Sequence, residues 1–131
     1  MSKLTILCVD DEKMVLDNLK IQLKGAFGDS YRYEFAQDAE DALDLIDELQ
    51  VEAISIILIV SDWLMPGMKG DEFLIRVHDR FPQVVTVLLT GQANDEAIAK
   101  AQTDANLHRC LFKPWTESEL IETIHSGLAK L

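Results

Sequence analysis

Carboxylates, a hydroxyl and an amine each follow a short apolar run, at four separate places in the sequence. They are Asp10 with Asp11, Asp62, Thr90 and Lys113. Two carboxylates about 4 Å apart repel each other by roughly 4 kcal/mol at an effective dielectric constant near 20. A fold that gathered these three aspartates would therefore need a cation. Because neither His nor Cys joins them, the oxygen-only ligand set favours Mg²⁺ or Mn²⁺ over zinc.

Whether these side chains meet depends on the elements that carry them. Runs typical of β-strands alternate along the chain with amphipathic runs of helical period. We expect strands at residues 4–9, 31–36, 54–60, 84–89 and 108–112. We expect helices over residues 13–27, 38–49, 73–81, 94–103 and 116–131, with Asp38 as the N-cap of the second.

Strands joined through helices run parallel, and right-handed crossovers place helices on both faces of the sheet. The run from Ile54 to Val60, in which five of the seven residues are β-branched, indicates a strand buried on both faces. The pattern therefore predicts an α/β doubly wound (βα)5 fold. Ligands of such sheets bind at the carboxyl ends of the strands, which is where the acids, Thr90 and Lys113 should converge.

Length and charge restrict the function classes. The 131 residues suit a single domain over 1–131, and the net charge of −11 disfavours nucleic acid and anionic membrane as partners. The longest apolar stretch, Ala53 to Val60, is too short to span a bilayer, and the N-terminus does not resemble a signal peptide. Cys8 and Cys110 lie in apolar stretches, so we expect a cytoplasmic protein with two reduced cysteines.

Each of these residues alone has an ordinary explanation. Asp10 or Asp11 could simply cap the next helix, Asp62 could be a turn residue ahead of Pro-Gly, and Lys113 could be a solvated lysine. Their joint occurrence at the carboxyl ends of buried strands is what favours a site.

Four motifs resemble those of one family over nearly the whole chain. They are VDDE at 9–12, SDWLMPGMKG at 61–70, LLTG at 88–91 and KPW at 113–115. Their order and spacing are similar to those in the receiver domains of bacterial two-component response regulators, the chemotaxis regulators included. The resemblance implies a flavodoxin-like fold with a five-stranded parallel sheet in the order 2-1-3-4-5.

The resemblance also implies a role for each site residue. Asp62 would accept a phosphoryl group from the phosphohistidine of a histidine kinase and form an aspartyl phosphate. Asp11 and Asp62 would bind Mg²⁺ (or Mn²⁺) directly, with the Leu64 carbonyl as a third protein ligand and Asp10 acting through water.

The remaining roles concern the phosphoryl oxygens. Lys113 would pair with one of them and Thr90 would hydrogen-bond another, assisted by the backbone N–H groups of Trp63 and Gly91. The resemblance further implies a cis peptide bond between Lys113 and Pro114.

The sequence departs from the family at one switch position. Receivers usually have an aromatic residue three positions before the lysine, and Cys110 stands there. A thiol is too small to fill the same cavity, and Phe112 lies on the same strand face at a different height. We therefore expect a muted or rerouted switch.

The resemblance to receiver domains also implies the partners. They are a histidine kinase or phosphotransfer protein, an output domain or partner protein, and a second copy of the chain through the face of the fourth helix, fifth strand and fifth helix. We expect no output domain within these residues, so the chain is either a stand-alone phosphorelay protein or the receiver of a longer regulator. Leu64 and Gln92 should tune hydrolysis because they border the path of the attacking water.

Three rival interpretations remain open at this point. A flavin- or nucleotide-binding protein would need Ser, Thr or Gly after the first strand, where this chain has Asp-Asp-Glu. A magnesium phosphatase usually has Asp-x-Asp there, with the nucleophile in that motif. A degenerate receiver used only for binding is the third, although all five key side chains are present. The family reading is a signalling phosphoacceptor that catalyses only its own phosphorylation and dephosphorylation.

Overall fold

The computed structural model describes residues 4–92 and 95–131, in which strands and helices alternate along the chain. The strands are β1 (Thr5–Val9), β2 (Arg32–Ala36), β3 (Ile56–Asp62), β4 (Val85–Thr90) and β5 (Leu107–Phe112). The α-helices are α1 (Lys13–Phe27), α2 (Ala39–Val51), α3 (Gly70–Arg80), α4 (Asp95–Asp104) and α5 (Glu117–Leu128). A short 3₁₀ turn, Gly28–Ser30, joins α1 to β2.

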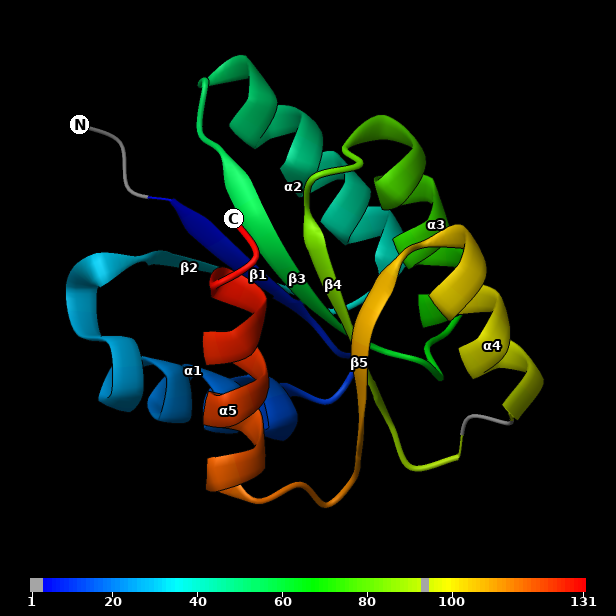
Figure 1. The fold of residues 1–131 in the computed structure, drawn as a ribbon. Coiled ribbons are helices and arrows are strands. Elements are labelled where there is room, and N and C mark those ends of the chain that lie inside the picture. Colours follow the sequence, from blue (N-terminus) through cyan, green and yellow to red (C-terminus); the bar gives the residue numbers. More distant parts are fainter. Residues whose placement is uncertain (1–3, 93–94) are drawn as a thin grey trace.

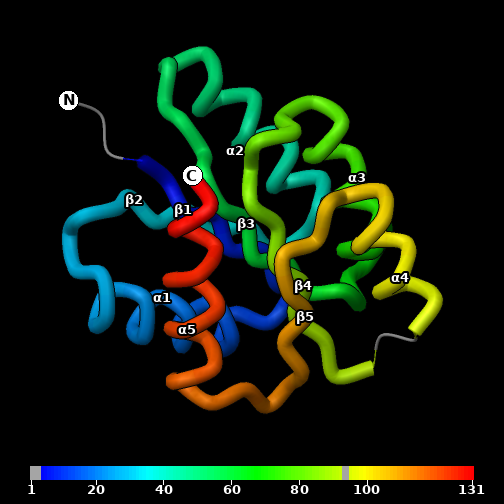
Figure 2. Tube along the Cα trace, in the orientation of Figure 1, coloured from blue at the N-terminus to red at the C-terminus, as the bar shows by residue number. Residues whose placement is uncertain are grey.

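All neighbouring strands are parallel, and their order in the sheet is β2-β1-β3-β4-β5. Helices α1 and α5 cover one face, and α2, α3 and α4 cover the other (Figures 1 and 2). The doubly wound, flavodoxin-like fold and its strand order are thus confirmed.

Two apolar cores fill the spaces between the sheet and its helices. One core includes Leu19 and Leu23 of α1 and Leu120 and Ile124 of α5, and the other includes Phe73 of α3. The strands contribute to both cores, because successive side chains point to opposite faces. Burial of β1 and β4 on both faces explains why their sequences are almost continuously apolar.

The element boundaries differ from the expected ones by up to three residues, and α3 begins at Gly70 and α5 ends at Leu128, each three residues earlier than expected. The third strand begins later than expected and extends to Asp62, because its ladder with β4 continues as far as the pair Asp62–Leu89. The side chain of Asp38 caps α2 by accepting a hydrogen bond from the Asp41 N–H at 2.7 Å, as predicted. The fourth helix begins at Asp95, and Asn94 lies outside the described residues.

Within the described ranges, none of the helices combines the length and apolar character that crossing a membrane requires.

Candidate functional site

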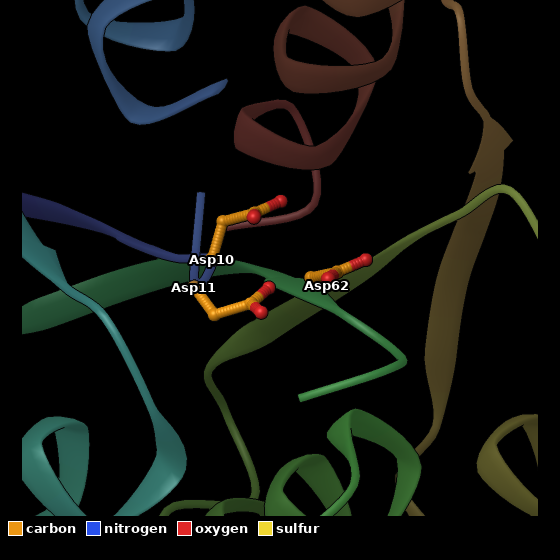
Figure 3. A group of neighbouring side chains, drawn as sticks. All are labelled: Asp10, Asp11 and Asp62. Carbon is orange, nitrogen blue, oxygen red and sulfur yellow. The ribbon is translucent and has the colours of Figure 1, made fainter. Parts of the chain in front are cut away.

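Three aspartates from two strand ends meet at the carboxyl edge of the sheet (Figure 3). Asp10 and Asp11 directly follow β1, and Asp62 is the last residue of β3. Each offers a carboxylate oxygen, and these oxygens all lie within 4.8 Å of one another. Asp10 is fully buried and Asp62 is 4% exposed, whereas Asp11 is exposed to solvent. Two carboxylates of the cluster, Asp10 and Asp62, are thus buried, and that of Asp11 faces solvent.

Lys113 supplies positive charge to this cluster of carboxylates. Its ammonium Nζ lies 2.9 Å from Asp10 Oδ2 and 3.1 Å from Asp62 Oδ1. Glu12 lies at the margin, with Oε1 at 3.9 Å from the same nitrogen. One cation therefore bridges the two buried carboxylates, which leaves the cluster with an excess of negative charge.

Burial, together with that excess of negative charge, changes the protonation behaviour of the site. Burial, followed by the charge of Asp10, raises the pKa of Asp62 to about 6, although Lys113 acts in the opposite direction. Burial by itself would lower the pKa of Lys113, but the hydrogen bonds and charges of Asp10 and Asp62 outweigh it, and the pKa is raised. The ammonium is therefore held in its charged form.

Backbone hydrogen bonds fix the strand ends that present these side chains. The Asp10 N–H donates to the Ala36 carbonyl at 3.1 Å, and the Lys113 N–H donates to the Thr90 carbonyl at 2.8 Å. Asp10 also accepts a hydrogen bond from the Glu12 N–H at 2.9 Å, which turns the chain into α1. The side chains of Asp10 and Lys113 thus stand on peptide units held by neighbouring elements.

The loop from Asp62 to α3 is closed by contacts around Trp63. The Gly70 N–H donates to the Trp63 carbonyl at 2.8 Å, and the indole Nε1–H donates to Asp71 Oδ1 at 3.1 Å. The ammonium of Lys69 lies 5.0 Å from the centre of the Trp63 ring, within cation–π range. A Cβ at Gly70 would collide with the Asp62 carbonyl, so only glycine permits this closure.

A solvent-accessible hollow of about 560 Å³ opens above the acid cluster. Its lining includes Asp11, Asp62 and Lys113, together with Leu64, Gly91 and Gln92. The neighbouring Thr90 is 1% exposed, and its hydroxyl accepts a hydrogen bond from the Gln92 N–H at 2.9 Å. The hollow gives water and small solutes a route from the solvent toward the carboxylate of Asp62.

The structure brings the residues predicted from the sequence to the acid cluster and its hollow, except that the N–H of Trp63 is already bonded and Cys110 lies elsewhere. The N–H of Trp63 donates to the Leu89 carbonyl at 2.8 Å, so its predicted contact with a phosphoryl oxygen would require that bond to be shared or moved. Cys110 does not line the hollow and is half-buried against the core beneath α3 and α4. Phe112 is 58% exposed and fills no cavity in its place. The Lys113–Pro114 bond is cis, as expected.

Sequence reasoning did not identify the partners of the two tryptophans. Asp71 and Lys69 hold Trp63, and the indole Nε1–H of Trp115 donates to Gln22 Oε1 at 2.8 Å. The contacts of Trp63 lie within one loop, and the charged residues near it in the sequence could have suggested them. The second joins the loop after β5 to α1, and no local pattern signals a contact between such distant residues.

The donor set of the acid cluster fits a hard divalent cation. Three carboxylates supply oxygen ligands only, and the Leu64 carbonyl belongs to the loop that borders the same hollow. Mg²⁺ prefers oxygen ligands and commonly binds through one or two carboxylates and water.

Comparison with known proteins decides the family. The sequence model of the response regulator receiver domain family matches residues 6–125 of the chain. The chain belongs to the response regulator receiver domain family. Receiver domains are signalling domains of two-component response regulators rather than conventional enzymes, and they bind Mg²⁺ at an acidic pocket.

Curated relatives of this receiver domain are longer proteins. The chain is 32% identical over 124 residues to the hydrogenase transcriptional regulatory protein HoxA of Cupriavidus necator, covering 95% of this chain and 24% of that protein. It is 30% identical to HoxA of Bradyrhizobium diazoefficiens, with the same coverage. The receiver domain therefore spans about a quarter of the length of the curated relatives that it matches.

Solved structures agree with the fold. The signal receiver domain of an HD domain-containing protein from Pseudomonas fluorescens superimposes with a TM-score of 0.85 at 31% identity, covering 97% of this chain and 95% of that one. A CheY-like receiver domain from Methanospirillum hungatei gives a TM-score of 0.82 at 28% identity, covering 98% and 96%.

Proposed function

We propose that this receiver accepts a phosphoryl group from a histidine kinase or phosphotransfer protein onto Asp62, with Mg²⁺ (or Mn²⁺) bound beside it. The observation that supports this most directly is the bridging of buried Asp10 and Asp62 by Lys113 beneath an accessible hollow. A carboxylate presented in this way is shielded on one side and open to a phosphoryl donor on the other.

The transfer forms one bond and breaks another. A carboxylate oxygen of Asp62 attacks phosphorus, and the phosphorus–nitrogen bond of the phosphohistidine breaks. The imidazole nitrogen keeps the electron pair and takes a proton from water. Lys113 stays charged throughout and pairs with a phosphoryl oxygen, which compensates the negative charge gathered at the acid cluster.

The metal would be held by Asp11 and Asp62 directly and by the Leu64 carbonyl, with Asp10 acting through water. When bound, a divalent cation offsets the repulsion between the carboxylates and the phosphoryl oxygens. Asp10 is fully buried, so its role is to hold Lys113 and the water ligands rather than to meet the donor.

Thr90 and the backbone of the next loop would recognise the phosphoryl group. The Thr90 hydroxyl would donate to one oxygen, and the N–H groups of Gly91 and Trp63 would assist. Leu64 and Gln92 line the same hollow, one apolar and one polar, at the entrance that a hydrolytic water must use. We propose that these two side chains tune the lifetime of the aspartyl phosphate.

The response to phosphorylation would be muted or routed away from the switch position. Cys110 is half-buried, and burial raises the pKa of its thiol to about 11, so it stays a small neutral group. A pair of structures, free and with beryllofluoride on Asp62, tests this. An ordered movement of several ångströms at the Cys110 face of β5 would contradict it.

Beyond the phosphoryl donor, we propose the type of partner that receives the signal. The output is a domain of the same polypeptide or a separate protein, and a homodimer through α4, β5 and α5 is a second way to transmit the signal. The HoxA relatives are named as transcriptional regulators, which makes a regulatory output domain the first arrangement to examine.

Intact-mass measurement after incubation with acetyl phosphate and Mg²⁺ tests the proposal. We expect one added phosphoryl group, absent from an Asp62→Asn variant and from a metal-free sample. Continued turnover of small phosphoesters would favour the magnesium phosphatase instead. The absence of an adduct under all conditions would favour a binding-only receiver, and the acid cluster would then serve metal binding alone.

A further inference from the structure

The outer edge of β2 is an open strand edge. Strand β2 is the last strand of the sheet, and β1 is its neighbour on the inner side. The Arg32 N–H donates to the Leu4 carbonyl, and the Ala36 carbonyl accepts from the Asp10 N–H, so both residues point their backbone groups inward. Because backbone direction alternates along a strand, Tyr33 and Phe35 point their N–H and C=O groups outward.

A basic hollow lies along this edge on the α1 face. It measures about 440 Å³ and is lined by Lys20 and Lys24 and by the aromatic residues Tyr31, Tyr33 and Phe35, with the carboxylate of Asp29 at one side. Arg32 also borders it, but its guanidinium is already paired with Glu34 at 2.6 Å, so the unpaired positive charge is that of the two lysines. Lys20 and Lys24 are exposed and one helical turn apart, an arrangement of like charges that destabilises a helix slightly. In residues 4–92 and 95–131, neither lysine forms an ion pair.

An acidic hollow lies along the same edge on the α2 face. It measures about 430 Å³, and its lining includes Asp41, Asp44 and Glu48, with Phe35 shared between the two hollows. These three acids recur along one side of α2 and, among the described residues, have no basic partner within ion-pair distance. One strand edge therefore has unpaired positive charge on one side and unpaired negative charge on the other.

We propose that the outer edge of β2 pairs with an extended segment of a partner protein in which acidic and basic side chains alternate. The backbone of such a segment would bond to the outward groups of Tyr33 and Phe35. Its successive side chains point to opposite faces, so every second residue would enter the basic hollow and the others the acidic hollow. Alternation of charge is the pattern that satisfies both sides at once.

The edge differs from the site around Asp62 in its chemistry. Its lysines and acids take no part in the phosphoryl site, so this inference goes beyond the proposed phosphoacceptor function and does not depend on it. Receiver variants altered at this edge should retain the acetyl phosphate reaction.

A capped ten-residue peptide of alternating Glu and Lys provides the first test, titrated into ¹⁵N-labelled protein. We expect the amide signals of Tyr33 and Phe35 to shift, and a peptide of five Glu followed by five Lys to bind at least tenfold more weakly. Methylating two adjacent central backbone nitrogens of the alternating peptide should abolish binding. Adjacent N–H groups of a strand point to opposite edges, so one N–H donor is then lost whichever edge of the peptide pairs with β2.

Charge reversal provides the matched protein control. A Lys20→Glu/Lys24→Glu variant should bind the alternating peptide about tenfold more weakly, whereas Lys100→Glu/Lys130→Glu, which makes the same change in net charge at exposed distant positions, should stay within twofold. Equal affinity for both peptides, or unmoved Tyr33 and Phe35 signals at millimolar peptide, would overturn the proposal, and the charges would then only protect the edge from self-association. Shifts that depend on protein concentration without peptide would overturn it in favour of a second copy.

Discussion

Lys113 and Asp10 are 103 residues apart in the sequence, yet the lysine ammonium donates a 2.9 Å hydrogen bond to the buried carboxylate of Asp10. The pair joins the two ends of the fold, because Asp10 follows the first strand and Lys113 follows the last. Asp62 between them receives the same ammonium at 3.1 Å. The ammonium of Lys113 therefore compensates the charge of both buried carboxylates.

Lys113→Met should destabilise the metal-free protein by about 3 kcal/mol, because the fully buried carboxylate of Asp10 would lose its cation. Urea unfolding in the presence of a chelator measures this. Saturating Mg²⁺ should restore part of the loss, since the metal supplies positive charge at the same oxygens. The matched variant Lys130→Met changes an exposed lysine and should unfold like the wild type; an equal loss in both variants would contradict the bridging role.

Asp62→Asn should abolish phosphorylation and stabilise the metal-free protein above pH 6. Burial raises the pKa of Asp62 to about 6, so the folded state binds this proton more tightly than the unfolded state does. The contribution of Asp62 to stability therefore falls as the pH rises from about 4 to 6 and stays low at higher pH.

A shift of about two units corresponds to roughly 2–3 kcal/mol. Chemical unfolding at pH 4, 5, 6 and 8 in chelator should show this decline in the wild type and a flatter profile in Asp62→Asn. Parallel profiles for the two proteins would show that the surroundings of Asp62 do not raise its pKa in the folded state.

Gly70→Ala should damage both stability and phosphorylation. The added Cβ would meet the Asp62 carbonyl and lie 2.9 Å from the Trp63 Cα, so the loop after Asp62 would have to open. We expect a loss of about 3 kcal/mol and a slower reaction with acetyl phosphate.

Gly25→Ala is the matched control for that variant. Nothing lies within 4 Å of a Cβ at this position in α1, and alanine favours helix by up to about 1 kcal/mol. This variant should be at least as stable as the wild type and should react normally. A fully reactive Gly70→Ala would show that closure of the loop is not needed for the chemistry.

Leu64→Asn and Gln92→Ala should change the rate at which the aspartyl phosphate is lost, since both side chains line the entrance to the hollow. We expect Leu64→Asn to shorten the lifetime several-fold, because a polar side chain can orient the attacking water. Release of phosphate from the isolated phosphorylated protein measures the rate. Unchanged rates in both variants would contradict a role for this entrance in hydrolysis.

The local patterns of the sequence were sufficient for the fold and for most of the site. The continuous apolar run Ile56–Val60 and the four-residue recurrence from Val15 to Phe27 are short-range patterns, which a linear sequence displays directly. Alternation of strand and helix then leaves few topologies, and the carboxyl-end rule brings Asp10, Asp62 and Lys113 to one edge.

Other features were decided only by the tertiary structure. The division of Lys113 between two carboxylates, the burial that raises the pKa of Asp62, and the bond between Trp115 and Gln22 all depend on distances between elements remote in the chain. The opposed charges beside β2 arise in the same way, because Lys20 and Asp44 belong to helices that the sheet separates. Sequence spacing determines which face of an element a residue occupies, whereas packing determines what that face meets.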